Sequence, residues 1–361
     1  MARVPFVTIA VPCFNEERHI EAFLDDVFAQ DYPADSIEVL IGDGMSTDKT
    51  REILERIAKT RPPSGTQLRM LDNPKRLQAA AMNIMIAAAK GDIIVRLDVH
   101  ARYAKDFVRQ CVTVLQETGA QNVGGPARPA AETWFQKAVC AALLSKLAVG
   151  NSSYRNLDAE GWVETAFPGA FPREVFEVVG GFDPNAVTNE DAELNQRIHE
   201  AGGRVFLSQK IVVHYFPRDS YRGLMKQYFK YGKGRARTML KHRGLPTIRP
   251  LLPFFLVVGG ATLLVTSPWH PLLLPAIGLY GSAALLEGLR VAAKEKRLHL
   301  APVVASIFPV LHMSHGVGFA AGLAHYFFKP DWDRHADDKP RRTFADLKQE
   351  NGIGRPEPTT V

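Results

Sequence analysis

A carboxylate and an imidazole stand two residues apart where an apolar run ends. The run IIVRL, residues 93–97, consists mainly of the branched apolar side chains of a buried strand, and Asp98 and His100 follow it. In an extended backbone, side chains two residues apart point to the same side. We therefore predict that both groups can reach one bound cation or one phosphate.

Two earlier apolar runs also end in residues that can bind a ligand. PCFNEE, residues 12–17, follows the first run, and GDGMSTDKT, residues 42–50, follows the second. In the second motif the glycines let the backbone approach a ligand, and Asp43 can accept hydrogen bonds from a base or a ribose. A capped turn alone would use the same residues.

Residues 6–125 must position these groups, and here short apolar runs alternate with amphipathic stretches. We predict strands at residues 6–14, 37–44 and 91–99, and helices at residues 17–30, 50–60, 77–90 and 105–119. The alternation indicates an α/β fold with parallel strands, in which ligands bind outside the carboxyl ends of the strands. The polar groups should therefore share one pocket. No G-x-G-x-x-G or G-K-[ST] motif is present, so neither a dinucleotide site nor a P-loop is predicted.

Composition limits the class of protein. The chain has 361 residues, of which 46% are hydrophobic and 23% charged, which suits one large or two ordinary folded units. The net charge is +6, but the first two hundred residues hold no long basic run interleaved with aromatic residues, so no nucleic-acid partner is expected. Cys13, Cys111 and Cys140 form no C-x-x-C motif, which indicates a reducing compartment.

The C-terminal third is apolar enough for a membrane. Residues 250–286 contain no charged residue and can form two helices of roughly 17 residues joined at SPWHP, which predicts a membrane hairpin. Residues 300–328 are also free of charge but hold Pro309, so they could form one tilted helix or two halves. We expect three to four hydrophobic helices in residues 250–328 and a polar tail in residues 329–361.

Basic residues flank the hairpin on both sides. KGRARTMLKHRG precedes it and RVAAKEKR follows it, which predicts a multi-pass protein of the cell inner membrane whose N-terminal domain is cytoplasmic. Residues 221–243 read as a basic amphipathic helix at the lipid surface. The side on which the tail lies stays open.

Five motifs occur in an order that resembles the family 2 glycosyltransferases. They are VPCFNEE, GDGMSTDKT, NPKRLQAAAMNIMIAAAKGDIIVRLDVHA, PGAFPREVFEVVGGFD and TNEDAELNQRI, and the resemblance covers residues 6–240. RLDVHA, YFPR and QYFKYGKGRART are most similar to the ExoA-like group, named for a succinoglycan-biosynthesis glucosyltransferase. The resemblance implies a GT-A catalytic domain in residues 1–240, with a Rossmann-like, mostly parallel mixed sheet. It also implies a nucleotide-sugar donor, inversion at the anomeric carbon and a divalent cation, Mg²⁺ or Mn²⁺.

The resemblance also implies roles for single residues. Asp191 matches the base that takes the proton of the acceptor hydroxyl, with Glu190 beside it, although both could merely be favourable charges in a helix's first turn. The residues expected to bind the nucleotide-sugar are Pro12, Asn15, Glu16, Asp43, Arg76 and Asp98.

Two departures from the family pattern affect these expectations. His100 stands where the last Asp of the family's D-x-D motif would lie, so Asp98 and His100 are the expected metal residues. His100 would either favour Mn²⁺ or contact phosphate without binding metal. The Q-x-x-R-W signature is missing, and Gln227 and Arg235, together with Gly169, are the expected contacts to the acceptor or diphosphate.

The resulting hypothesis is an inverting transferase with a UDP-sugar donor, expected to be UDP-glucose. The acceptor would be a polyprenyl-diphosphate-linked saccharide at the cytoplasmic membrane face, in exopolysaccharide or cell-surface glycan synthesis. Two alternatives are a polyprenyl-phosphate sugar synthase and a nucleotide-sugar-binding membrane protein without activity. In the first alternative the acceptor phosphate ionises without help, so Asp191 would matter less as a base.

Overall fold

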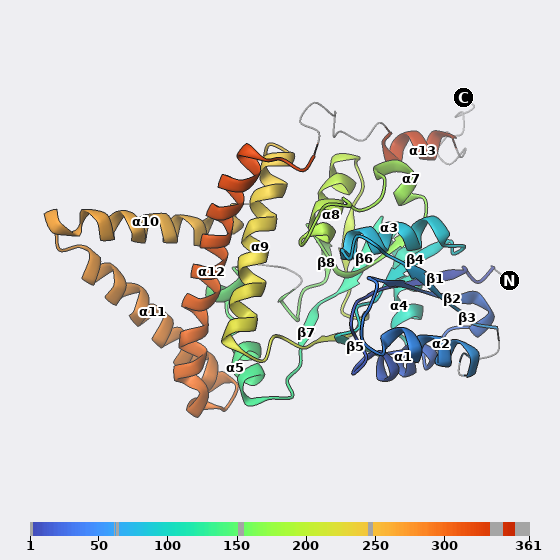
Figure 1. The fold of residues 1–361 in the computed structure, drawn as a ribbon, viewed down its shortest axis with the longest axis horizontal. Coiled ribbons are helices and arrows are strands. Elements are labelled where there is room, and N and C mark those ends of the chain that lie inside the picture. Colours follow the sequence, from blue (N-terminus) through green and yellow to red (C-terminus); the bar gives the residue numbers. More distant parts are fainter. Residues whose placement is uncertain are drawn as a thin grey trace, which may run out of the picture.

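An eight-stranded mixed sheet forms the centre of the N-terminal domain in a computed structural model that describes residues 3–60, 62, 65–150, 155–244, 248–332 and 342–350 (Figure 1). The strand order is β3-β2-β1-β4-β9-β6-β10-β8. The strands are β1 Val7–Cys13, β2 Ile37–Asp43, β3 Gln67–Asp72, β4 Ile93–Arg96, β6 Asn122–Gly125, β8 Gly161–Val163, β9 Phe167–Pro172 and β10 Val205–Leu207.

Most of the strand pairs are parallel, as predicted. β1 pairs with β2 and β4, β2 with β3, and β6 with β10, all in parallel. β1 and β2 are buried along their whole length, which is typical of strands covered on both faces. β9 is the exception at the centre, because it runs antiparallel to both β4 and β6 and joins the two parallel halves.

Helices cover both faces of this sheet. One core cluster joins the sheet to α1 Ile20–Phe28, α2 Thr50–Thr60 and α4 Phe107–Thr118. The other joins it to α3 Gln78–Ala88, α7 Val175–Val179 and α8 Glu190–Glu200. Alternate residues of β1 serve the two cores, since Ile9 and Val11 belong to the first and Ala10 to the second. A small second sheet has the order β5-β11-β7, from Ala101–Tyr103, Val213–Tyr215 and Ala127–Pro129.

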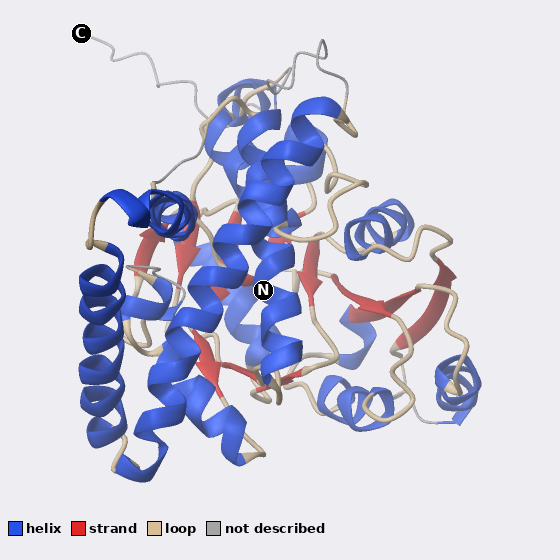
Figure 2. Ribbon diagram, turned by 60° about the vertical axis from the view of Figure 1, so that its left-hand side comes forward, coloured by secondary structure: helices blue, strands red, loops and turns tan. Residues whose placement is uncertain are grey.

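Long helices lie against one side of this domain. They are α9 Tyr221–Lys241, α10 Leu252–Thr266, α11 Leu273–Lys294 and α12 Ala301–Phe328. α9 and α12 run side by side, whereas α10 and α11 project away from the domain as a hairpin (Figure 1). Figure 2, in which this side comes forward, shows long helices in front of the strands. Two short helices, α5 Trp134–Leu143 and α6 Lys146–Val149, pack near the start of α12.

The apolar third has the helices that its composition predicted. Among the described residues, three helical segments are long and apolar enough to cross a membrane, namely Arg249–Trp269, Leu273–Lys294 and Leu298–Phe328. The turn between α10 and α11 contains the predicted SPW segment, Ser267–Trp269. α12 is one continuous helix in spite of Pro309, which decides between the two alternatives left open above.

The last described segment returns to the N-terminal domain. α13, Phe344–Glu350, follows a stretch of the predicted polar tail, and residues 333–341 and 351–361 of that tail lie outside the described residues. The backbone N–H of Phe344 donates to the carbonyl oxygen of Ala201 at 3.2 Å. Phe344 and Leu347 are buried in the same core cluster as α8.

Candidate active site

One cavity of about 1540 Å³ lies at the carboxyl ends of the central strands and reaches the C-terminal helices. Among the described residues, the following predicted site residues line it: Pro12, Glu16, Asp98, His100, Glu190, Asp191, Gln227 and Arg235. Its other end is lined by residues of α10, α11 and α12, including Leu256, Tyr280 and Leu311. The cavity therefore connects the polar strand ends with the apolar helices.

The predicted extended backbone from residue 93 through His100 is wrong. β4 ends at Arg96, and a turn follows in which the N–H of Ala101 donates to the carbonyl oxygen of Asp98 at 3.1 Å. The two side chains find different partners, because Asp98 pairs with Arg96 and His100 pairs with Glu16. The Nε of Arg96 lies 3.0 Å from Asp98 Oδ1, and Nε2 of His100 lies 2.9 Å from Glu16 Oε1.

His100 belongs to a group of side chains that is suited to bind a divalent cation. One ligand atom each from Glu16, His19 and His100 lies within 4.8 Å of the other two, and the two imidazole rings meet edge to face with 4.9 Å between their centres. Two imidazoles and one carboxylate are a donor set that Mn²⁺ accepts more readily than Mg²⁺ does. The donor set fits a cation, and sequence reasoning missed His19 because it lies on a different segment, just before α1.

Arg96 is a site residue that sequence reasoning missed. Its side chain is only 6% exposed and bridges Asp98 and Glu190, with 3.0 Å from its NH1 atom to Glu190 Oε1. Burial opposes the charge of the guanidinium, but the carboxylates of Asp98, Glu190 and Asp191 outweigh it and raise the pKa of Arg96. The available signal was a single arginine inside the apolar run IIVRL, where a charge needs a partner.

Glu190 and Asp191 begin α8 and occupy different environments. Glu190 is buried, and this burial raises the pKa of its carboxyl; Arg96 opposes the shift and Asp191 adds to it. Asp191 is half-buried, and its Oδ1 accepts a hydrogen bond from the N–H of Ala192 at 2.8 Å. The backbone of Asn189, immediately before the helix, is left-handed with φ 61°. The Asp191 carboxylate therefore borders the cavity without an ion pair to a described residue, whereas Glu190 is tied to Arg96.

A buried ion-pair network fixes α8 against α9, two residues beyond Asp191. The carboxylate of Glu193 on α8 is 1% exposed and lies 3.0 Å from Lys241 Nζ on α9 and 3.0 Å from Nε2 of His242 just after it. Arg197 adds a contact of 2.8 Å from α8 itself. Burial raises the pKa of Glu193, but the hydrogen bond with His242 and the charges of Arg197 and Lys241 outweigh it and hold the pKa well below its usual range.

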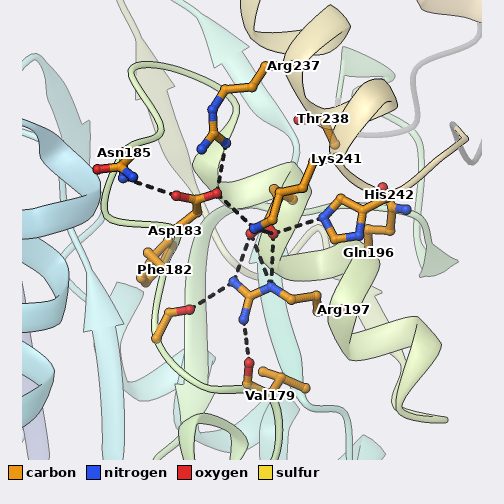
Figure 3. Close-up of polar contacts among 12 residues, drawn as sticks. Val179, Phe182, Asp183, Asn185, Gln196, Arg197, Arg237, Thr238, Lys241 and His242 are labelled. Atoms are coloured by element: carbon orange, nitrogen blue, oxygen red, sulfur yellow. Dashed lines mark hydrogen bonds and ion pairs between the residues drawn. The ribbon is translucent and has the colours of Figure 1, made fainter. Parts of the chain in front are cut away.

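Asp183 continues this network and lies beside Arg237 and Lys241 (Figure 3). Its Oδ2 lies 2.8 Å from both Arg237 and Lys241, and Arg237 also contacts Asp331 at 2.7 Å. Burial opposes ionisation of Asp183, yet the hydrogen bonds from the two cations lower its pKa. The helix that carries Asp191 is thus joined by charged contacts to the helices of the C-terminal region.

Four predicted site residues are not among those that line the cavity. Asp43 is buried and accepts hydrogen bonds from Arg51 and Ser46, both at 2.6 Å. The Asn15 side chain accepts from the N–H of Thr47 at 2.8 Å, so Asn15 and Asp43 hold the loops after β1 and β2.

The other two residues outside the lining are a surface cation and a buried glycine. The guanidinium of Arg76 is exposed and lies 5.9 Å from the centre of the Phe14 ring. A Cβ at Gly169 on β9 would lie 2.9 Å from Asn122 Oδ1 and closer still to the Phe171 ring. Packing alone therefore requires glycine at position 169.

α9, which stands where the family has its Q-x-x-R-W signature, presents polar groups to the cavity. Gln227 donates to the hydroxyl oxygens of Tyr215 and Tyr231 at 3.1 and 3.0 Å, and Arg235 lines the cavity two turns later. These contacts fix Gln227 between two tyrosines.

The chain is similar to known glycosyltransferases. Residues 8–170 match the family described as Glycosyl transferase family 2. The chain is 36% identical over 315 residues, 86% of this chain and 93% of the other, to the succinoglycan biosynthesis protein ExoA of Rhizobium meliloti (strain 1021).

Two further proteins are similar over most of their length. A dolichyl N-acetyl-alpha-D-glucosaminyl phosphate 3-beta-D-2,3-diacetamido-2,3-dideoxy-beta-D-glucuronosyltransferase of Methanococcus voltae is 28% identical over 88% of this chain and 97% of its own. The solved mannosyltransferase PcManGT of Pyrobaculum calidifontis, in complex with GDP-Man and Mn²⁺, superposes with a TM-score of 0.58 and 25% identity, over 92% of this chain and 89% of that chain. The chain therefore has a GT-A fold, belongs to glycosyltransferase family 2 and is a glycosyltransferase.

Proposed function

We propose that the enzyme transfers a sugar from a UDP-sugar, with inversion, to a lipid-linked saccharide at the cytoplasmic face of the inner membrane. The observation that carries the proposal is that one cavity has Asp98 and Asp191 at one end and apolar residues of α10–α12 at the other. The likeness to a succinoglycan biosynthesis protein supports a role in exopolysaccharide or cell-surface glycan synthesis. Glucose is the proposed sugar.

Asp191 is the proposed base. In an inverting transfer the acceptor hydroxyl attacks the anomeric carbon and loses its proton, so a carboxylate must lie within hydrogen-bond reach of that hydroxyl. Asp191 borders the cavity, while Arg96 neutralises Glu190 and Asp98 on either side. Arg96 thereby limits the repulsion between the carboxylates of Asp98 and Glu190.

Glu16, His19 and His100 are the residues that fit a divalent cation, and Asp98 lines the same cavity as Glu16 and His100. The ion, when bound, neutralises charge on the diphosphate leaving group. The family's pattern assigns Asp98 and His100 to this ion, and the geometry adds Glu16 and His19 to that set. Pro12, Asn15, Asp43 and Arg76 remain the proposed nucleoside side of the donor site.

The acceptor end of the cavity combines apolar and cationic side chains. Leu252, Leu256 and Leu311 offer an apolar wall for a polyprenyl chain. Arg218, Arg235 and Arg249 also line the cavity and suit the charge of a diphosphate. Gln227 and Gly169 stay candidates for contact with, or support of, the acceptor.

Release of UDP by the detergent-purified protein tests the proposal. The assay uses a panel of UDP-sugars with membrane lipid extract and either Mg²⁺ or Mn²⁺. We expect lipid-dependent turnover that falls about 10²–10⁴-fold in Asp191→Asn, the range for loss of a general base. Asp98→Asn should also lose activity. Glu177→Gln, an exposed acidic residue of α7 away from the cavity, is the matched control and should behave as wild type.

Two outcomes would replace the proposal. If Asp191→Asn stayed fully active with the lipid extract, an acceptor that ionises by itself would be indicated, as in a polyprenyl-phosphate sugar synthase. If the wild type bound UDP-sugars but released no UDP with any of them, the lipid-linked transfer proposed here would be wrong for these donors.

A further inference from the structure

We propose that α12 lies along the membrane surface and does not cross the bilayer. The α10–α11 hairpin is then the only part of the described chain that enters the hydrocarbon, and the C-terminal segment stays on the side of the catalytic domain. This inference concerns the membrane topology and does not depend on the transfer reaction. It differs from what composition alone indicates, since α12 is long and apolar enough to span.

The first step is that α9 cannot enter the hydrocarbon. α9 carries seven basic residues distributed along its 21 residues: Arg222, Lys226, Lys230, Lys233, Arg235, Arg237 and Lys241. Each lysine or arginine at the centre of a membrane helix strongly disfavours insertion of that helix. α9 therefore lies in water or in the interface between water and lipid.

The second step is that α12 follows α9 at backbone contact. A Cβ on Gly318 of α12 would lie 2.1 Å from the carbonyl oxygen of Phe229, and one on Gly322 would lie 2.8 Å from that of Lys233. A Cβ on Gly232 of α9 would lie 2.0 Å from the carbonyl oxygen of His315. Because the two backbones approach this closely at three glycines, α9 and α12 form one rigid pair. α12 must therefore lie at the same depth in the membrane as α9.

The third step concerns the two ends of α12. Near its start, Val304, Ile307 and Phe308 are buried in one cluster with residues of α5. Just past its end, the carboxylate of Asp331 lies 2.7 Å from Arg237, and its carbonyl accepts from Asn185 Nδ2 at 2.8 Å. A helix of 28 residues is about 42 Å long, so crossing a hydrocarbon core of about 30 Å would put one end on the far side. Both ends contact the domain instead.

α13 gives an independent reason for the same conclusion. Its Phe344 and Leu347 are buried in the core cluster that contains Leu194 and Ile198 of α8. A segment that follows α12 and packs on the catalytic domain must lie on the same side of the membrane as that domain.

The exposed face of α9 has the pattern of a helix at a lipid surface. Tyr221, Met225 and Phe229 form an exposed apolar row with a spacing of four residues. Arg222, Lys226 and Lys230 form an exposed basic row beside it, suited to anionic headgroups. The occupant of this face is therefore an anionic bilayer surface.

The hairpin, in contrast, is exposed and apolar. The hydrophobic part of the first candidate span, Arg249–Trp269, is 0% buried inside the protein, against 44% for the span that includes α12. The first charged residue of α11, Glu287, lies at the domain end, where it accepts a hydrogen bond from Ser145. α10 leaves the α9–α12 pair crosswise, as a hairpin inserted from a surface would (Figure 1).

Labelling of single cysteines with a membrane-impermeant maleimide tests the side of the tail. The background is the full chain with Cys140→Ala, since Cys13 and Cys111 are buried. Gln349→Cys on α13 is compared with Glu55→Cys on α2, both at exposed positions. We expect both to react in inside-out vesicles and both to lose the reaction in right-side-out vesicles. Reaction of the two positions from opposite sides would overturn the proposal.

Depth measurements test α12 itself. Val317, an exposed residue near the middle of α12, and Leu264, an exposed residue of α10, are changed singly to cysteine and labelled with a fluorophore. We expect a lipid nitroxide near the headgroup to quench position 317 more strongly than one near the chain end, and the reverse order at position 264. Equal preference for the deep nitroxide at both positions would show that α12 crosses.

Discussion

Replacement of Arg96 by methionine should destabilise the catalytic domain and make its stability depend on pH. Methionine keeps the apolar part of the side chain but removes the cation that contacts Asp98 and Glu190, each at 3.0 Å. Glu190 would then stand with a side chain only 6% exposed and Asp191 as its neighbour. Removing one partner of a buried ion pair typically costs about 3–5 kcal/mol. For a domain of this size, that corresponds to a fall in Tm of about 6–20 °C.

The pH dependence follows from Glu190. Burial already raises the pKa of its carboxyl, and without Arg96 the pKa rises further. An acid with a raised pKa binds more protons in the folded than in the unfolded state, so stability falls as pH rises. Between the unfolded value of about 4.3 and the raised folded value, the slope is about 1.36 kcal/mol per pH unit for one such group. Arg96→Met should therefore lose less stability at pH 6 than at pH 8.

Thermal unfolding of the detergent-purified protein at pH 6 and pH 8 measures both effects. Adding Glu190→Gln to Arg96→Met removes the buried charge, so the double variant should recover part of the lost stability and should no longer show the added pH dependence. Arg56→Met is a matched control, because Arg56 and its partner Glu21 are both exposed. The reasoning would be refuted if Arg96→Met unfolded within about 1 °C of wild type, or if the double variant were no more stable than the single one.

Three further predictions concern other parts of the molecule. The pKa values of Glu193 and Asp183 are held low, so the stability that these two carboxylates contribute is present at neutral pH and is lost as pH falls below about 4. Glu193→Gln should therefore lower Tm at pH 7 and reduce the loss of Tm between pH 5 and pH 3, as measured by thermal unfolding. Gly232→Leu should lower Tm and increase proteolysis between α9 and α12, because even a Cβ at this position lies 2.0 Å from the carbonyl oxygen of His315. His100→Asp should shift the cation preference of UDP-sugar binding from Mn²⁺ toward Mg²⁺ in calorimetric titrations, and an unchanged preference would exclude His100 as a ligand.

The parallel half of the sheet was predictable because its signal is local. β1 and β2 lie inside the predicted strands, and α2 covers the predicted residues 50–60. Their residues form continuous apolar runs followed by amphipathic stretches, and both faces of the strands are buried. β9 was not predictable in this way. Its sequence FPGAFP has two prolines and a glycine, and only its neighbours β4 and β6 make it a strand.

The site was predictable in its residue types but not in its pairings. Asp98, His100, Glu190 and Asp191 do line one cavity. Glu190 and His100 find their partners far along the chain, in Arg96, 94 residues from Glu190, and in Glu16. The turn after Arg96 redirects His100 toward Glu16, and no periodic pattern encodes such a turn. The position of α12 likewise depends on backbone contacts with α9, which hydropathy cannot show.

The shape of the cavity has a consequence for the kinetics of this transferase. One end of the cavity lies at the strand ends of a polar domain, and the other lies among α10, α11 and α12. A nucleotide-sugar would arrive by diffusion in three dimensions, whereas a lipid-borne acceptor would arrive by diffusion in a plane. Saturation by the acceptor would then depend on its mole fraction in the bilayer, so diluting the membrane with inert lipid should slow the reaction even when the total amounts of enzyme and acceptor are unchanged.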